Sequence, residues 1–215
     1  MSRLSRFAPL TGVVFALLGF AGFAISKANS LSSTASGSQV IGFYTAHHAG
    51  QTTSDILLTV GFAMFLIFAG SVGDRLRQGD HREPFGAIAL VAAGVLTAGA
   101  LAFFSVDFAL ASGYGQLTPD AAQALNLLAF RLVLPACAGA LVFGVAAGLA
   151  VIRSAIVPRW LGVIAIVIGL VGMSPLLAVA LMALYAWTLV VAVILVARAG
   201  ALSDSRAPAL ESQVA

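Results

Sequence analysis

The chain has 215 residues, of which 60% are hydrophobic and 9% are charged, and its mean hydropathy is +1.04. Soluble domains carry about 25% charged residues, so this composition excludes an ordinary soluble fold and predicts a protein that uses lipid as its solvent. The net charge of +3 does not indicate nucleic acid binding, because the basic residues are scattered between apolar runs. We therefore expect one all-α domain, residues 1–199, with the lipid bilayer as its partner.

The first apolar run, Pro9 to Ile25, follows two arginines and precedes a serine-rich stretch. Its length suits a membrane span. A signal peptide has the same layout, but Ser26-Lys27-Ala28 is a poor cleavage site. We favour an uncleaved signal anchor, and cleavage remains the alternative. A loop over residues 26–54 is expected next, with a break at Gly50–Ser54 that caps the following helix.

The second span is predicted over Asp55–Val72 and the third over Pro84–Phe104, with the polar segment Gly73–Glu83 between them. A loop over residues 105–121 leads to Thr118-Pro119-Asp120, which has the pattern of a helix N-terminus. The helix that starts there meets no strong stop before Arg153, a length of about 50 Å at 1.5 Å per residue. Its first turns should therefore project from the bilayer, unless the helix breaks at a proline.

The apolar run Trp160–Ala197 is too long for one span, and Ser174-Pro175 divides it into spans five and six. Proline suits the first position of a helix because its missing N–H costs nothing there. Five prolines fall where these helices should begin, at Pro9, Pro84, Pro119, Pro158 and Pro175. Another, Pro135, offers a kink inside span four. Residues 200–215 are expected to form a short disordered cytoplasmic tail.

Positive charges predict the orientation, because lysine and arginine are retained on the cytoplasmic side. One side receives nine arginines: Arg3, Arg6, Arg75, Arg77, Arg82, Arg153, Arg159, Arg198 and Arg206. The other side receives only Lys27, while Arg131 lies in or near span four. The predicted fold is a polytopic bundle of six transmembrane helices with both termini in the cytoplasm, placed in a bacterial plasma membrane.

Small residues should bring the helices together, since lipid removes most of the hydrophobic drive between them. Span four carries four small residues on one face, at Ala136, Ala140, Gly144 and Gly148. Expected partner surfaces are Gly94 and Ala98 in span three and Gly162, Gly169 and Gly172 in span five. Such faces also make a homo-oligomer a possible partner. Cys137 is interpreted as a small buried hydrophobe and Trp187 as a side chain packed within the bundle.

Polar groups at the edge of a membrane are costly and invite functional hypotheses. One candidate cluster lies on the extracytoplasmic side: Tyr44, His47, His48, Asp55, Asp107 and Arg131. A histidine and a carboxylate seven residues apart suggest a metal site, but a third ligand with clear spacing is missing, so no metal is predicted. For the arginine we favour snorkelling to the interface over binding an anionic group or pairing with Asp107.

Common catalytic motifs are lacking: G-x-S-x-G, H-E-x-x-H and a phosphate-binding glycine loop do not occur. We expect no cofactor and favour a binding, sensing or structural component of the envelope over an enzyme. It would act on an unknown small ligand or on a membrane protein partner. The alternatives are a small-solute or ion transporter with a polar vestibule and a membrane-embedded metal-dependent hydrolase.

The segment Ile156-Val157-Pro158-Arg159-Trp160-Leu161-Gly162, which follows Phe143-Gly144 and the run ending in Arg153, resembles a family of bacterial multi-pass membrane proteins known only as a domain of unknown function. A basic, polar loop after the second span is similar as well. The resemblance implies the same arrangement of six helices. It implies no catalytic residue, substrate or cofactor.

Overall fold

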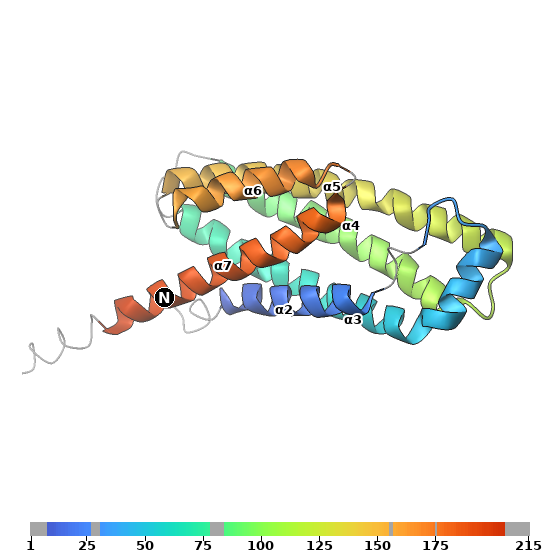
Figure 1. Ribbon diagram of the computed structural model, residues 1–215. Coiled ribbons are helices and arrows are strands. Elements are labelled where there is room, and N and C mark those ends of the chain that lie inside the picture. Colours follow the sequence, from blue (N-terminus) through green and yellow to red (C-terminus); the bar gives the residue numbers. More distant parts are fainter. Residues whose placement is uncertain (1–7, 27–30, 78–83, 155–156, 175, 205–215) are drawn as a thin grey trace, which may run out of the picture.

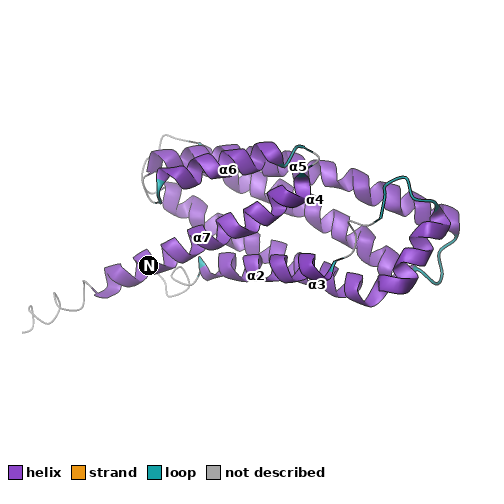
Figure 2. Ribbon diagram, in the orientation of Figure 1, coloured by secondary structure: helices purple, strands orange, loops and turns teal. Residues whose placement is uncertain are grey.

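The computed structural model describes residues 8–26, 31–77, 84–154, 157–174 and 176–204. Every regular element in these ranges is an α-helix (Figure 2), which confirms the all-α class. The helices are α2 (Leu10–Ile25), α3 (Gly37–Arg77), α4 (Phe85–Gly113), α5 (Pro119–Ser154), α6 (Arg159–Val171) and α7 (Leu177–Asp204).

The helices form one bundle in which neighbours in sequence are neighbours in space. Each helix from α2 to α6 packs against the next one, and α7 packs back against α2, so the bundle closes on itself. The start of α2 and the end of α7 lie at the same end of the bundle (Figure 1). This arrangement needs only short connections, as is usual for helices that run alternately up and down.

Four helices are long and apolar enough to cross a membrane: α3 over residues 37–74, α4, α5, and α7 over residues 177–198. The other two are shorter, with 16 residues in α2 and 13 in α6. At 1.5 Å per residue they measure about 24 and 20 Å, less than the hydrocarbon thickness of about 30 Å. The chain is therefore a multi-pass membrane protein with four candidate spans and two shorter apolar helices.

Three helices continue past the level at which α2 and α6 end and α7 begins (Figure 1). We call this part, residues 31–53 and 108–129, the α3–α5 extension. It has a small core of its own, separate from the main one and made of Ala35, Val40, Tyr44, Leu110, Ala111 and Ala122. The expected projection of α5 is thus part of a packed three-helix structure.

The expected break at Gly50–Ser54 is wrong, because α3 is one continuous helix. The hydroxyl groups that were expected to cap a new helix instead bond to backbone carbonyls. Thr53 donates to Ala49 O at 2.9 Å and Ser54 donates to Gly22 O of α2 at 2.8 Å. Most of the expected loop 26–54 is therefore helical from residue 37 onward.

Other helix ends also lie further along the chain than the sequence predicts. Helix α3 continues past Val72 to Arg77, and α4 continues to Gly113, so only residues 114–118 remain of the expected loop 105–121. Helix α7 includes residues 200–204 of the expected tail. Residues 78–83 and 205–215 lie outside the described residues.

The predicted role of proline at helix starts is confirmed at four positions. Pro119 is the first residue of α5, and Pro9, Pro84 and Pro158 directly precede α2, α4 and α6. Pro175 lies outside the described residues. Pro135 lies inside α5 and does not end it. The whole helix has 36 residues, which confirms its predicted length.

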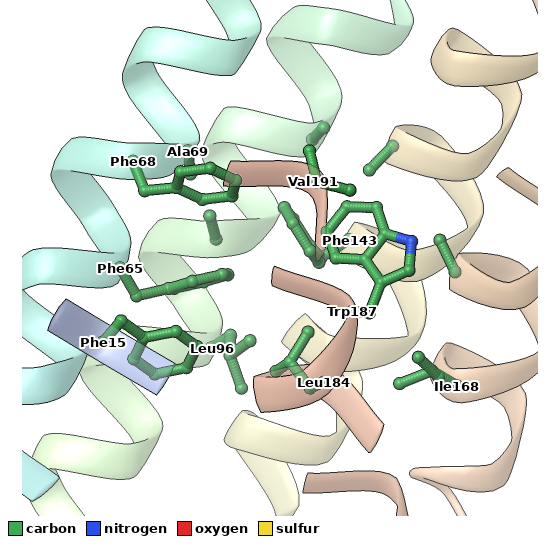
Figure 3. Close-up of a cluster of buried hydrophobic side chains, with 14 of the residues drawn as sticks. Phe15, Phe65, Phe68, Ala69, Leu96, Phe143, Ile168, Leu184, Trp187 and Val191 are labelled. Atoms are coloured by element: carbon green, nitrogen blue, oxygen red, sulfur yellow. The ribbon is translucent and has the colours of Figure 1, made fainter. Parts of the chain in front are cut away.

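Aromatic side chains connect four helices through the main core (Figure 3). Ring centroids are separated by 4.8 Å between Phe15 and Phe65, 5.2 Å between Phe65 and Phe143, and 6.2 Å between Phe143 and Trp187. Trp187 Nε1 also donates a hydrogen bond of 2.8 Å to Leu161 O of α6. The prediction that this tryptophan packs inside the bundle is confirmed, and its polar atom has the partner that burial requires.

The small residues of α5 allow backbone contact with the helices on both sides. A Cβ atom placed on Gly144 would lie 2.5 Å from Ala165 O, and one on Gly148 would lie 2.5 Å from Gly162 O. On the α4 side, a Cβ on Gly99 would lie 2.5 Å from Ala136 N. The predicted stripe of α5 therefore packs within the chain and is not available to a second copy.

Two further expectations about small residues have different outcomes. Gly94 was expected to line a helix contact, but a Cβ placed on it would meet nothing within 4 Å. Gly99, five residues later and therefore on another face of α4, makes the close contact instead. Cys137 is 8% exposed, which confirms it as a buried side chain.

We predict opposite effects for the same substitution at two helical glycines. Gly144→Ala should lower the free energy of unfolding by about 1–3 kcal/mol, because the new methyl group collides with the backbone of α6. Gly94→Ala, the matched control, should raise it by about 0.5–1 kcal/mol, because alanine loses less backbone entropy in a helix. Reversible unfolding in mixed micelles measures both. Equal effects would contradict the packing of α5 on α6.

Candidate functional site

Buried polar side chains are concentrated where the α3–α5 extension meets the rest of the bundle. Those less than 5% exposed among the described residues are Gln51, Ser54, Asp55, Thr97, Asp107, Asn126 and Thr188. Five of these seven belong to α3, the outer part of α4 or the first turns of α5. Burial of polar groups is costly unless they are paired, so this concentration marks a candidate site.

Asp107 is the centre of the site. It lies in α4 and is 3% exposed. Its Oδ1 accepts a short hydrogen bond from the Tyr44 hydroxyl, and its Oδ2 accepts one of 2.5 Å from Gln51 Nε2. Gln51 also contacts Ser26 Oγ, at 3.4 Å, just after α2 ends. One carboxyl group thus joins α4 to α3 and, through an amide, to α2.

The spacing along α3 explains why its side chains converge on Asp107. Tyr44, Gln51 and Asp55 are separated by seven and four residues, so a continuous helix places them on one face. Helix α3 packs against α4, and this face is buried there. The first turns of α3 bend relative to the rest of the helix (Figure 1), and Tyr44 and Gln51 both still reach Asp107.

Asp55 has an unusual environment for a carboxyl group. It is 1% exposed and accepts no hydrogen bond of normal geometry from a donor in the described chain, and the polar side chains beside it are Asp107 and Gln51. It interacts electrostatically with Asp107, a group of like charge. Burial of a charged carboxyl group costs several kcal/mol unless the group is paired, so Asp55 and Asp107 are the most costly pair of polar groups in the site.

The structure brings together three of the six residues in the predicted cluster: Tyr44, Asp55 and Asp107. The two histidines are exposed. His47 Nδ1 lies 2.9 Å from Phe43 O, and its ring stacks on that of Phe43. The His48 ring stacks on Tyr114, just past the end of α4. His48 is therefore not part of the buried site, although it lies seven residues before Asp55 in the same helix.

Arg131 is exposed on α5. The alternative of a pair with Asp107 is not what the structure shows, because the Asp107 oxygens accept hydrogen bonds from Tyr44 and Gln51. Exposure near the end of a long apolar stretch is the position from which an arginine snorkels. Arg131 therefore remains outside the site.

Sequence reasoning missed two of the polar residues around the site. Gln51 was interpreted as part of a helix break, and its role was visible only in its helical spacing from Tyr44 and Asp55. Asn126 donates from Nδ2 to Ser32 O at 3.0 Å and so attaches the segment before α3 to α5. No local pattern in the sequence signals that contact, because the two residues are 94 positions apart.

The described part of the chain does not assemble a set of metal ligands at this site. The described residues include no group of three or more histidine, cysteine, aspartate or glutamate side chains arranged to hold a metal ion. Zinc sites use three or four such ligands. The groups that contact Asp107 are hydrogen-bond donors, the Tyr44 hydroxyl and the Gln51 amide N–H.

Comparisons with protein-family models, curated proteins and solved structures find no match to this chain. The resemblance suggested by the Pro-Arg-Trp-Leu-Gly step is therefore supported only at the level of architecture. Length and composition of the helices define the class of protein: an α-helical, multi-pass integral membrane protein.

The hydroxyl group of Tyr44 should contribute measurably to stability. Tyr44→Phe leaves a buried carboxylate oxygen without its donor, and we expect the free energy of unfolding to fall by about 1–3 kcal/mol. Tyr114→Phe is the matched control, because Tyr114 is only half-buried and stacks on His48 through its ring. Unfolding in detergent measures both variants. A Tyr44→Phe protein as stable as the control would argue against the Tyr44–Asp107 bond.

Proposed function

We propose that the chain crosses a bacterial plasma membrane six times, with both termini in the cytoplasm. Three observations support this topology. The arginines are distributed to one side, and α7 packs back on α2. The start of α2 and the end of α7 also lie at the same end of the bundle (Figure 1). In this topology the α3–α5 extension stands on the extracytoplasmic side, and α2 and α6 cross a locally thinned bilayer.

Cysteine labelling in intact cells tests the topology. In a Cys137→Ser background, His48→Cys and Met173→Cys should react with a membrane-impermeant thiol reagent from outside. Arg159→Cys should react only after permeabilisation. All three side chains are exposed in the protein. If a cysteine at position 173 also reacted only after permeabilisation, α6 and α7 would not cross the membrane as separate spans.

We infer that the protein is a non-enzymatic binding or sensing component of the envelope and that Tyr44, Gln51, Asp55 and Asp107 form its ligand site. We call these four residues the carboxyl site. The observation that carries this inference is Asp55, a buried carboxyl group that lies beside a second carboxyl group, Asp107, and accepts no hydrogen bond of normal geometry within the described chain. A positively charged ligand would compensate both, and its binding would be reported through α3 and α4 to the extension.

A thermal-unfolding screen of the purified protein tests the site. Metal cations, spermidine and tetramethylammonium should include a compound that raises the midpoint, whereas citrate and phosphate should not. Binding to the folded state stabilises it by about 2.7 kcal/mol at a hundred times the dissociation constant. Asp55→Asn should abolish the response. Asp120→Asn, an exposed acid in the first turn of α5, should keep it.

Failure of this screen has a clear meaning. If no cationic compound raises the midpoint while the wild type and Asp120→Asn unfold cooperatively, the carboxyl site does not bind a cationic ligand. Binding of citrate or phosphate that survives Asp55→Asn would direct attention to the exposed Arg131 instead.

A transporter is the second candidate, and one observation favours it. Asp55 and Asp107 are buried between two helices that are both candidate spans, and acidic groups in such helices are frequent in ion pathways. The test is flux into proteoliposomes with the cation identified by the screen. Uptake equal to that of empty liposomes, or unchanged by Asp55→Asn, would exclude this role for the site.

A metal-dependent hydrolase has less support. Its histidine ligands would have to be His47 and His48, and both are exposed and turned toward neighbouring aromatic rings. The described residues do not assemble the three ligands that such chemistry uses. We therefore do not extend the proposal to it.

A further inference from the structure

We propose that an apolar groove between α4 and α5 binds an anionic phospholipid, with an acyl chain in the groove and the phosphate at Arg153. This inference goes beyond the proposed function, because the groove is separate from the carboxyl site. It uses the proposed topology only to assign the lipid to the cytoplasmic leaflet.

The groove is formed by apolar side chains on the outer surface of the bundle. It has a volume of about 390 Å³, and its lining includes Ile88, Val91 and Val95 of α4 and Ala138 and Val142 of α5. Val91 is 69% exposed. Because α4 and α5 are both candidate spans, hydrocarbon chains and not water fill such a surface. We call this feature the α4–α5 groove.

Backbone contact closes the α4–α5 groove at one end. A Cβ atom placed on Gly139 would collide with Leu96 N, and one on Gly99 would lie 2.5 Å from Ala136 N. From Leu96 back to Phe85, at the start of α4, there are eleven residues, which correspond to about 16 Å. This length is about half of the hydrocarbon thickness of about 30 Å. The groove therefore matches one acyl chain of a single leaflet.

The open end of the groove carries a positive charge. Arg153 is exposed, and its Cζ lies 4.9 Å from the centroid of the Phe85 ring. Arg153 follows Val142 by eleven residues, about three turns, so it continues the α5 side of the lining. Phe85 precedes Ala92, another lining residue, by seven residues and continues the α4 side. The arginine therefore stands where the headgroup of a lipid in the groove would lie.

The chemistry of arginine suits a phosphate at this position. Stacking on Phe85 uses the face of the guanidinium group, whereas its N–H donors lie in the plane of the group. These donors bind two phosphate oxygens at once, in charge-assisted hydrogen bonds that are about twice as strong as neutral ones. The aromatic ring thus orients the arginine without replacing its hydrogen-bonding role.

The surrounding charge favours an anionic lipid over a zwitterionic one. In the proposed topology the cytoplasmic side has nine arginines and five acidic residues in sequence. Arg159, the first residue of α6, is exposed at the same end as Arg153. The end of α3, with the sequence Asp74-Arg75-Leu76-Arg77, adjoins the start of α4, since a Cβ on Gly73 would lie 3.6 Å from Gly86 O. Basic sites between membrane helices on this side typically bind anionic headgroups.

A bound lipid would complete the packing of α4 on α5. Small residues, such as Ala92 and Gly139, leave the two helices without long side chains between them along the groove. Dispersion contacts are a main source of attraction between helices in lipid, and an acyl chain held there would supply them. We therefore expect the lipid to stabilise the bundle and to stay bound during purification.

Native mass spectrometry of the full chain measures the bound lipid. The protein is released from mixed micelles that contain equal amounts of phosphatidylglycerol and phosphatidylcholine with the same acyl chains. We expect retained lipid with a preference of about tenfold for phosphatidylglycerol, equivalent to about 1.4 kcal/mol. Phosphatidylglycerol should also raise the thermal midpoint more than phosphatidylcholine does, because it binds the folded state more tightly.

Two variants separate the headgroup from the acyl chain. Arg153→Gln should reduce the preference to about twofold or less, while phosphatidylcholine is still retained. Ala138→Phe should reduce the retention of both lipids, because the new ring fills the groove from an exposed position. The matched controls are Arg131→Gln and Ala63→Phe, at exposed positions away from the groove, and both should behave like the wild type.

Three results would overturn the inference. Equal retention of the two lipids by the wild type would show that Arg153 selects no headgroup. A midpoint raised as much by inorganic phosphate as by phosphatidylglycerol would show that the groove takes no part in binding. A wild-type dimer that Ala138→Phe converts into a monomer would mean that a second copy occupies the groove.

A second variant keeps the test decisive if Ala138→Phe does not unfold cooperatively. Ile88→Trp fills the same groove from the α4 side, at a side chain that is 39% exposed. Lipid retention unchanged in this folded variant would also overturn the inference. None of these outcomes depends on the carboxyl site, so the proposed function is tested separately.

Discussion

Contact between backbones at the small residues of α5 is the interaction on which the remaining structure depends. A helix in lipid gains little from burying more apolar surface, so close approach has to supply the attraction. Helix α5 meets this condition on two sides, with Gly144 and Gly148 against α6 and Ala136 against Gly99 of α4. Since α4 and α6 are placed by α5, their neighbours α3 and α7 are placed in turn, and α2 fills the space between those two.

The carboxyl site depends on this arrangement indirectly, through the position that α5 gives to α4. Because α4 is held along α5 for most of its length, its outer part continues beside α5 past the ends of the shorter helices (Figure 1). Helix α3 then packs on that outer part, and the face that carries Tyr44, Gln51 and Asp55 is buried against Asp107. The polar residues are therefore enclosed by helices whose own packing is apolar.

The fold and the site also divide the molecule into parts with different physical properties. The main core consists of interlocking aromatic and aliphatic side chains with few polar atoms, as Figure 3 shows around Phe65, Phe143 and Trp187. The α3–α5 extension has a small core, and polar contacts such as that of Asn126 with Ser32 hold its connections. An extension with so little apolar contact opens locally more easily than the main core does.

By itself, the sequence determined the class of protein, the number of apolar helices and most of their starting points. Composition and hydropathy indicate that the surrounding solvent is lipid, and proline is favoured at the start of a helix, so both signals can be found from local sequence. Pro135, which lies inside α5, is the exception. The sequence also identified Tyr44, Asp55 and Asp107 as candidates. The tertiary structure decided that α3 does not break at Gly50–Ser54, because Ser54 bonds to the end of α2 and Gln51 to α4. It also decided which polar residues meet, since that depends on helix faces buried by partners distant in sequence.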